Sequence, residues 1–288
     1  MVKLATAREI RMYGPRRAKN QWEYINAGLY LFATVILVGG LAAQFSEAGD
    51  SKSGLVVILI ALGILTFVNL HDLTAHMAGI DYRCSLMEYD LQLALVEFAV
   101  PSVHALGSIL NFVGIGLLLL QEEKHYDFGF EQHALNLLIA GPALWVLGSM
   151  HDLCQYYERA DGHVQILQKG VQIPFLLGSL LFLVGGILNT HSHFGSTQRG
   201  LKLLSKTWVW MGIAAGLLFF IGGFINVIKV FKMQQMDGGR LEKLRGGAQE
   251  WLSRAREGQV PLILEEQRRR RIQAEEPTPY KDVLLSRP

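Results

Sequence analysis

The sequence predicts an all-α polytopic membrane protein, a bundle of six transmembrane helices arranged as three tandem hairpins. Half of the 288 residues are hydrophobic and only 18% are charged, and the hydrophobic residues are gathered in blocks that contain almost no charge. Lysine and arginine concentrate before the first block and after the last one. Short sequence steps also recur between blocks at intervals of about 70 to 80 residues. These observations predict the spans, their orientation and an internal repeat.

The apolar blocks are long enough to cross a bilayer as helices. A membrane core of about 30 Å requires about 20 residues of helix, and a backbone in lipid must satisfy its own hydrogen bonds. The expected spans are residues 25–45, 54–70, 100–120 (with an alternative start at 93), 134–150, 173–189 and 208–231. Residues 25–232 therefore form the expected membrane domain, between a basic arm of residues 1–24 and a polar, partly disordered cytosolic tail of residues 233–288.

The distribution of lysine and arginine predicts that both termini lie in the cytosol, because basic residues are retained on that side. The arm before the first span and the flank after the last span are rich in them, whereas the loops after the first three spans hold one each. Only the loop after the fifth span, with Arg199, Lys202 and Lys206, is basic on the expected outer side. No organelle address is evident, which favours the endomembrane system or the plasma membrane and leaves an organelle membrane as the alternative.

The spans can be aligned with one another as three copies of a two-helix unit. The odd-numbered spans share a Val-Gly step, which occurs at Val38-Gly39, Val113-Gly114 and Val184-Gly185. The even-numbered spans share a polar step near their ends, which reads His71-Asp72-Leu73, His151-Asp152-Leu153 and, in the third copy, Ile225-Asn226-Val227. The expected hairpins are therefore residues 25–71, 93–151 and 171–231.

Small residues recur along the spans and predict close contacts between helices, since helices in lipid associate where their backbones can approach. They occur at Gly39-Gly40, Gly107-Ser108, Gly114, Gly116, Gly178-Ser179, Gly185-Gly186 and Gly222-Gly223. The same residues also suit seams between copies of the chain in a homo-oligomer, and the sequence does not separate these two interpretations.

The last hairpin contains "IPFLLGSLLFLVGGILN" followed by "TWVWMGIAAGLLFFIGGFINVIKVFK". This stretch resembles the YrhK-type two-helix membrane domain, which has a Gly-Ser or Gly-Gly step in each helix, a tryptophan near the second start and a basic exit. The resemblance covers mainly residues 171–232 and implies a helical hairpin, without implying an activity. The two His-Asp steps are not part of the pattern.

Ionisable residues inside a membrane span are candidates for function, because a charge in lipid is costly. Glu97 and His104 flank Pro101 at a spacing of seven residues, so they share one face of the third span. That span enters from the side on which the His-Asp steps lie. The residues expected near one depth are therefore Glu97, His104, His71, Asp72, His151 and Asp152.

Three interpretations of this group stay open. Imidazole with carboxylate suits a proton relay or a divalent metal such as zinc or iron. His71 and His151 would also supply two ligands to a haem. In the structural interpretation, Glu97 reaches the membrane interface, His104 bonds to a neighbouring helix, and the aspartate of each step caps the segment that follows.

Two regions outside the spans carry weaker signals. The expected outer loops hold histidines beside acidic residues, which suit either weak binding of a divalent cation or a solvated acidic surface. These histidines are His125, His133, His191 and His193. The tail holds the basic run Arg268, Arg269, Arg270 and Arg271, and a stretch from Tyr280 to Val283 that resembles a tyrosine-based sorting signal. The basic run suits lipid contact, an endoplasmic-reticulum signal or a stop-transfer cluster.

No catalytic or phosphate-binding motif is evident, so the sequence predicts neither an enzyme nor a bound cofactor. The favoured function is a structural, scaffolding or regulatory component of the lipid bilayer, whose tail recruits protein partners and which binds no nucleic acid. The alternative is a small transporter or channel for protons or a divalent metal that uses Glu97, His104 and the His-Asp steps. A haem-binding redox membrane protein is the third candidate.

Overall fold

The computed structural model describes residues 16–45, 51–79, 82–88, 91–123, 128–154, 162–195 and 204–235. Over these residues every regular element is a helix, which confirms the predicted all-α class. Six of the described helices are long and apolar enough to cross a membrane, as predicted. They are α2 (Arg16–Ala43), α3 (Ser51–Gly79), α5 (Val100–Glu123), α6 (Phe128–Cys154), α7 (Gly162–Gly195) and α8 (Lys206–Gln235).

The third span begins before α5. It is preceded by the short helices η1 (Cys84–Glu88), α4 (Leu91–Ala94) and η2 (Leu95–Ala99), of which η2 is a π-helix. The apolar span runs from Leu95 to Gln121, close to the earlier of the two predicted starts. The wide π turn, in which the Val100 N–H donates to the Leu95 carbonyl, carries the helix into Pro101, a residue with no N–H of its own.

The two helices that carry the His-Asp steps extend past their predicted ends. Helix α3 continues through the first His-Asp step to Gly79, and α6 continues through the second to Cys154. The prediction that each aspartate caps the following segment is therefore wrong for Asp72, which lies inside α3. Burial against the bundle keeps this last part of α3 helical, since Ala75 is only 3% exposed.

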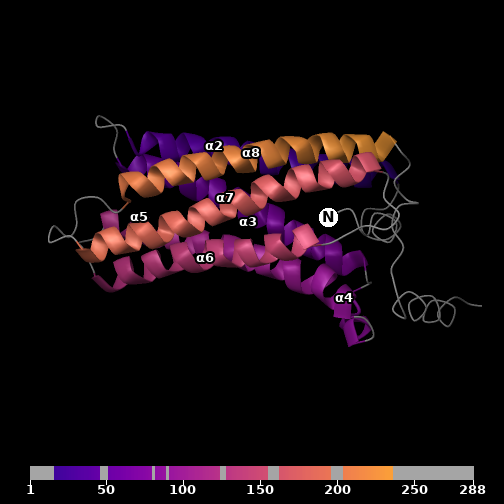
Figure 1. Ribbon diagram of the computed structural model, residues 1–288, viewed down its shortest axis with the longest axis horizontal. Helices are drawn as coiled ribbons and strands as arrows, with labels where there is room; N and C mark the ends of the chain where they lie inside the picture. The colour runs from indigo at the N-terminus through magenta and orange to yellow at the C-terminus, as the bar shows by residue number, and fades with distance from the viewer. Residues whose placement is uncertain are drawn as a thin grey trace, which may run out of the picture.

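The six long helices form a closed ring in which each packs mainly against two neighbours. Consecutive helices pair as α2 with α3, α5 with α6, and α7 with α8; these hairpins join through α3 with α5, α6 with α7, and α8 with α2. The helices run side by side along the long axis of the molecule (Figure 1). We call the end where α2 begins and α8 ends the proximal end, and the opposite end the distal end.

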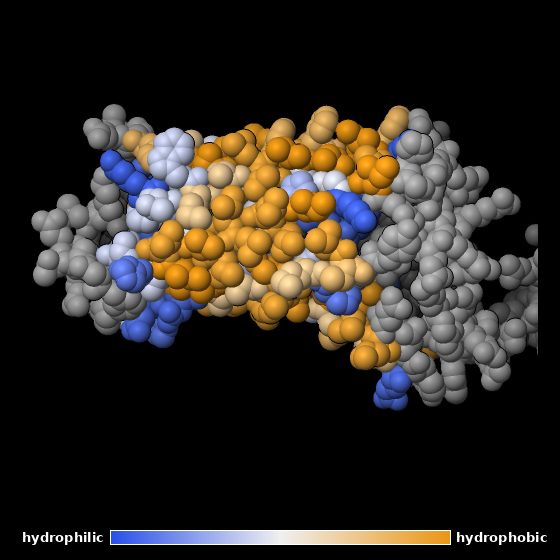
Figure 2. Space-filling model, viewed as in Figure 1, coloured by the Kyte–Doolittle hydropathy of each residue, from blue (hydrophilic) through white to orange (hydrophobic). Residues whose placement is uncertain are grey.

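The outer surface of the ring is apolar over its middle. Figure 2 shows hydrophobic residues covering the centre of the bundle, with hydrophilic residues toward both ends. The exposed side chains include Phe32, Phe67, Trp210 and Leu217, each at least half exposed. A continuous apolar band of this kind is uncommon on soluble monomers. The chain is therefore a multi-pass membrane protein whose lipid-facing surface is this band.

Small residues mediate contacts within all three hairpins. In the first, a Cβ atom on Gly40 would lie 2.8 Å from the Ile58 backbone nitrogen. A Cβ atom on Gly107 would lie 2.7 Å from Trp145 Cδ1, and one on Gly178 would lie 2.6 Å from Phe219 Cε1. Only glycine lets these aromatic rings pack so closely on the facing helix backbone. Gly39, by contrast, is exposed and has nothing within 4 Å of a built Cβ, so it takes no part in a seam within the chain. Contacts between copies of the chain stay a prediction.

Candidate functional site

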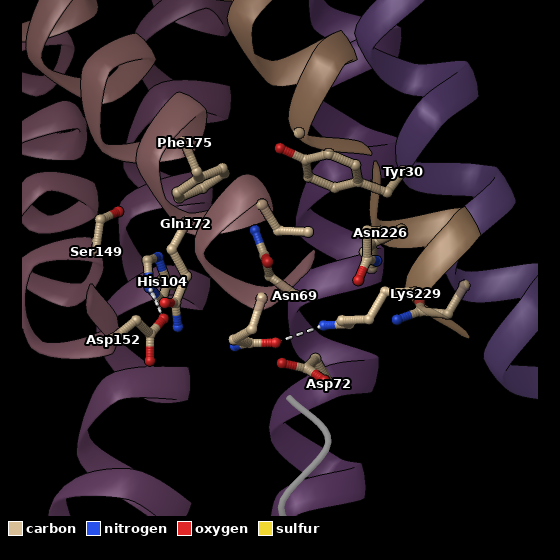
Figure 3. Close-up of a pocket in the computed structure, with 15 residues that line it drawn as sticks. Tyr30, Asn69, Asp72, His104, Ser149, Asp152, Gln172, Phe175, Asn226 and Lys229 are labelled. Atoms are coloured by element: carbon tan, nitrogen blue, oxygen red, sulfur yellow. Dashed lines mark hydrogen bonds and ion pairs between the residues drawn. The ribbon is translucent and has the colours of Figure 1, made fainter. Parts of the chain in front are cut away.

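A polar cavity lies on the ring axis near the proximal end. It has a volume of about 80 Å³ and receives side chains from all six long helices (Figure 3). Its titratable lining residues, apart from Tyr30, are Asp72, His104, Asp152 and Lys229. Its side-chain amides are Asn26, Asn69, Gln168, Gln172 and Asn226. The cavity therefore presents both signs of charge together with neutral donors and acceptors, within the apolar spans of the bundle.

His104 and Asp152 form the wall contributed by α5 and α6. His104 Nε2 lies 3.3 Å from Asp152 Oδ2, and the imidazole is only 6% exposed. The ring fits here because α6 has a glycine opposite it: a Cβ on Gly148 would lie 2.6 Å from His104 Nε2. Phe175 of α7 meets the imidazole edge-on, at 5.4 Å between ring centroids. These contacts hold the imidazole in one place beside the carboxylate.

A hydrogen-bond network ties α3, α5 and α6 together on the distal side of this wall. Asn69 Nδ2 lies 2.6 Å from Ser108 Oγ, and Ser108 Oγ donates to the His104 carbonyl at 3.0 Å. Trp145 Nε1 lies 3.2 Å from both the His104 carbonyl and Ser108 Oγ. Buried polar networks that are satisfied in this way fix the relative positions of the elements that carry them. The network thus sets where His104 stands relative to α6.

Lys229 forms the wall contributed by α8. It is 1% exposed, and its Nζ donates a hydrogen bond of 2.9 Å to Gln168 Oε1 of α7. In the sequence this lysine resembles one of the basic residues that flank the last span. The signal that identifies it is periodicity: Gly222, Asn226 and Lys229 follow at i, i+4 and i+7, so they share one helix face, and all three line the cavity.

An aromatic layer closes the ring on the distal side of the cavity. Phe175 lines the cavity and stacks on Phe219, with 4.9 Å between ring centroids. Trp145 and Phe182 each lie 5.7 Å from Phe219, which is 1% exposed. Phe219 precedes Asn226 by seven residues on α8, which places it about 10 Å further toward the distal end. In Figure 3, Phe175 and Tyr30 lie above the cavity and the two aspartates lie below it.

The structure brings together three of the six intramembrane candidates. Asp72, His104 and Asp152 line the cavity. Glu97 is 2% exposed in η2 and is not a lining residue. His71 turns instead toward Trp22, with the rings stacked at 6.1 Å. His151 lies half-buried on α6 without lining the cavity.

The remaining candidates lie elsewhere. His133 and His191 are exposed on α6 and α7 near the distal end. His125, the side chain of His193, the basic run 268–271, Tyr280 and Val283 fall outside the described residues. Among the residues that the structure does describe, no three His, Cys, Asp or Glu side chains are grouped closely enough to hold a metal ion.

The geometry of the cavity permits two kinds of chemistry. Opposed charges and amides can bind a small solute, and a proton can pass between the His104 and Asp152 side chains, which are within hydrogen-bonding distance. Within the membrane both would require the polar walls that the six helices supply. In comparisons with known proteins, the chain matches no protein-family model, no curated protein and no solved structure.

Proposed function

We propose that this chain is a membrane transporter for a small polar solute, which enters the cavity from the proximal end. The observation that carries the proposal is the convergence of Asp72, Asp152, His104 and Lys229 on one cavity at the ring axis, inside the apolar spans. Burial of a charged side chain away from water is costly, by about 3 kcal/mol at the centre of a membrane helix and by less near the end of a span. Four titratable side chains on one cavity are therefore best accounted for by a ligand or a proton that uses them.

The size of the cavity favours a small solute over a cofactor. Pockets for drug-sized ligands and cofactors have volumes of about 300 to 1,000 Å³, several times the 80 Å³ of this cavity. The small volume also counts against a haem. In addition, His71 and His151, the two expected haem ligands, do not line the cavity. A divalent metal as the solute also has less support, because Lys229 places a positive charge on the same lining.

The repeat supports the same function. Asp72, Asp152 and Asn226, which the alignment places at one position of the three copies, all line the cavity. The alignment of the odd-numbered spans also equates Gly107 with Gly178. The alignment of the even-numbered spans, extended toward their N-terminal ends, equates Trp145 with Phe219. These are the partners of the two glycine–aromatic contacts. Many transporters are built from internal repeats around a central binding site. We infer that the hairpins are copies of one unit, for which the YrhK-type resemblance is a further argument.

The proposed orientation follows from the basic arm and flank. With both termini in the cytosol, the proximal end and its cavity would face the cytosol, while the aromatic layer would close the path to the other side. Transport then requires a second conformation in which the layer opens and the proximal end closes. A scaffold, the function that the sequence favours, requires no such change.

Cysteine accessibility distinguishes these functions without knowledge of the solute. The two native cysteines, Cys84 and Cys154, are both exposed and would be replaced by serine. In this background Asn226→Cys places a thiol in the cavity, and Leu217→Cys, at a half-exposed position of the same helix, places a matched control in the lipid. The protein is reconstituted in vesicles of defined orientation and treated with a membrane-impermeant thiol reagent from one face at a time.

A transporter is expected to be modified at the cavity thiol from both faces, because it visits both conformations. The lipid-facing thiol is expected to react from neither face. Modification of the cavity thiol from the proximal face alone, even on long exposure, would contradict transport and favour a fixed structural component.

A further inference from the structure

We propose that the solute is a small alkylammonium ion, of the size of methylammonium or ethylammonium, and that it competes with a proton held by the His104–Asp152 pair. The inference rests on the proposed function, because it assigns the solute of the same cavity and the ion that is exchanged for it. It is carried by the balance of charges on the lining and by the aromatic rings that close the distal end of the cavity.

The lining carries more negative than positive charge while His104 is neutral. Its carboxylates are Asp72 and Asp152, and Lys229 is the only lysine or arginine on it among the residues that the structure describes. One lysine can offset at most one carboxylate, and Figure 3 draws Asp72 beside Lys229. The other carboxylate therefore depends for its counter-charge on the imidazole, which is positive only when it is protonated.

Asp152 is the carboxylate that the imidazole serves. His104 Nε2 lies 3.3 Å from Asp152 Oδ2, and the Asp152 side chain is 23% exposed. With a neutral imidazole the pair holds one negative charge, which is costly inside the membrane because the surroundings have a low dielectric constant. A proton on the imidazole removes that net charge, and so does a monovalent cation bound to the carboxylate. The proton and the cation therefore compete with one another.

The imidazole has a ring position for this proton. When Nε2 carries the ring hydrogen and donates it to Asp152, the lone pair is on Nδ1. His104 Nδ1 is buried and has no hydrogen-bond partner within the described part of the chain. Protonation at Nδ1 makes the ring an imidazolium without breaking its contact with Asp152, so the pair gains one proton and becomes neutral.

Other titratable side chains surround the pair on the helices packed against it. They are Tyr30 on α2, Asp72 and His76 on α3, Glu97 on η2, His151 on α6 and Lys229 on α8. Histidine is the side-chain type that ordinarily changes charge between about pH 5 and 8. His76 and His151 do not line the cavity, so a pH effect on a bound cation is assigned to His104.

The distal end of the cavity suits the alkyl part of the ion. Phe175 and Tyr30 both line the cavity, with 6.3 Å between their ring centroids, and in Figure 3 they lie above it, opposite the two aspartates. Aromatic rings attract a cation that comes within about 6 Å of their centres. An alkylammonium can therefore place its N–H groups on a carboxylate and its carbon atoms against the rings.

The volume limits the ion to about three non-hydrogen atoms. A cavity of about 150 Å³ in another protein holds one benzene molecule, and this cavity has about half that volume, 80 Å³. Methylammonium and ethylammonium fit within this limit. Benzylammonium, which carries a whole phenyl ring, is expected to be excluded.

The test measures binding to the full chain purified in lipid nanodiscs. Binding of radiolabelled methylammonium is measured by scintillation proximity at about pH 8, and competition is measured with ethylammonium, acetamide, acetate, sodium and benzylammonium. Ethylammonium is expected to compete best. Acetamide and acetate are expected to be at least about tenfold weaker because they lack the positive charge. Sodium is expected to be weaker because it has no alkyl group to pack against the rings.

The pH dependence assigns the proton. At about pH 5.5, methylammonium binding is expected to be at least about tenfold weaker than at about pH 8, because the proton then occupies the pair. His104→Gln, which cannot take up the proton, is expected to bind equally at both pH values. His151→Gln, the matched control, removes a histidine that does not line the cavity and is expected to keep the wild-type pH dependence.

Asp152→Asn removes the carboxylate and is expected to weaken methylammonium binding at least about tenfold at about pH 8. Methylammonium binding that Asp152→Asn leaves unchanged would overturn the assignment of the cation to this pair. If a variant does not fold, the wild-type competition series and the wild-type pH dependence decide without it.

Each outcome bears on one proposal. Acetamide, acetate or sodium binding as tightly as ethylammonium, equal wild-type binding at the two pH values, or a pH dependence that His104→Gln retains would overturn the inference. So would the absence of methylammonium and ethylammonium binding in a protein whose cavity thiol reacts from both faces, and transport would then stand with another solute. Binding with the expected pH dependence in a protein whose cavity thiol reacts from one face only would keep the site and overturn transport.

Discussion

The two halves of the ring axis differ in what their buried polar groups contact. In the distal half, two buried polar side chains bond to backbone: Thr34 Oγ1 donates to the Leu31 carbonyl, and Asn189 Oδ1 accepts from the Ser205 N–H just before α8. In the proximal half, His104, Asp152 and Lys229 instead meet other side chains across helices at a cavity. The helices and their neighbours are the same in both halves, so the fold alone does not require the polar axis of the proximal half.

The difference between the two halves is tested most strongly by placing a new carboxylate in each of them. Asn111→Asp puts a charge into the tight α5–α6 seam, where a Cβ on Gly141 would lie 2.5 Å from Asn111 Nδ2 and the amide donates to the Gly107 carbonyl. An unpaired buried charge costs about 4 kcal/mol. We expect this loss in the free energy of unfolding, measured in mixed detergent micelles.

The matched variant is Asn226→Asp, which introduces an aspartate at the position that the alignment equates with Asp72 and Asp152. Here the new charge faces the cavity, and Lys229 follows at i+3, so we expect a loss below about 1 kcal/mol. Equal losses in the two variants would show that the cavity gives a charge no better surroundings than the seam does.

The aromatic layer is the boundary between the halves, and Phe219→Ala removes its centre. Phe219 is 1% exposed and packs on Phe175, Trp145 and Phe182. Truncation of a buried phenylalanine costs about 3 kcal/mol or more. We expect a loss of this size in the same unfolding assay, together with increased proton leakage through reconstituted vesicles.

Phe224→Ala is the control, because Phe224 lies on the same helix and is 52% exposed toward the lipid. Its unfolding free energy and its leakage are expected to stay close to those of the wild type. Leakage that does not rise in Phe219→Ala would mean that another part of the distal half closes the path.

The fit between α6 and His104 can be tested by a single methyl group. In Gly148→Ala the new Cβ would lie 2.6 Å from His104 Nε2, so the imidazole must move away from its place beside Asp152. Overpacking of this kind costs about 2 kcal/mol. Gly39→Ala, which adds the same group where nothing lies within 4 Å, should leave thermal stability unchanged. A Gly148→Ala variant as stable as the wild type would show that His104 has room to shift.

The sequence predicted the fold well because lipid imposes simple requirements. A helix that crosses the membrane must be long and apolar, and the six blocks met both conditions. The predicted ends were less accurate at the proximal end. Gln168 and Gln172, for example, precede the predicted fifth span, which begins at residue 173, yet they lie on α7 inside the ring. A polar cavity lowers hydropathy within a helix, and this resembles the end of a span.

The candidate site was predicted in part for the same reason. Asp72, His104 and Asp152 drew attention as ionisable residues in or beside apolar segments, and all three line the cavity. Lys229 did not, because a lysine near the end of a span resembles a flanking charge. Its direction toward the axis follows from helix rotation and from the position of Gln168 on a neighbouring helix. Neither is visible in a single apolar block.

The smallest expected effect concerns the His104–Asp152 pair itself. A double-mutant cycle compares His104→Gln, Asp152→Asn and the double variant with the wild type, so that the cost common to each single change cancels. The two side chains are 3.3 Å apart, and Asp152 is partly exposed to the cavity, with a side-chain exposure of 23%. A contact of this length to a partly hydrated carboxylate is expected to contribute a coupling energy of about 1 kcal/mol. A coupling energy indistinguishable from zero in the unfolding assay would mean that the two side chains lie close together without stabilising the folded state.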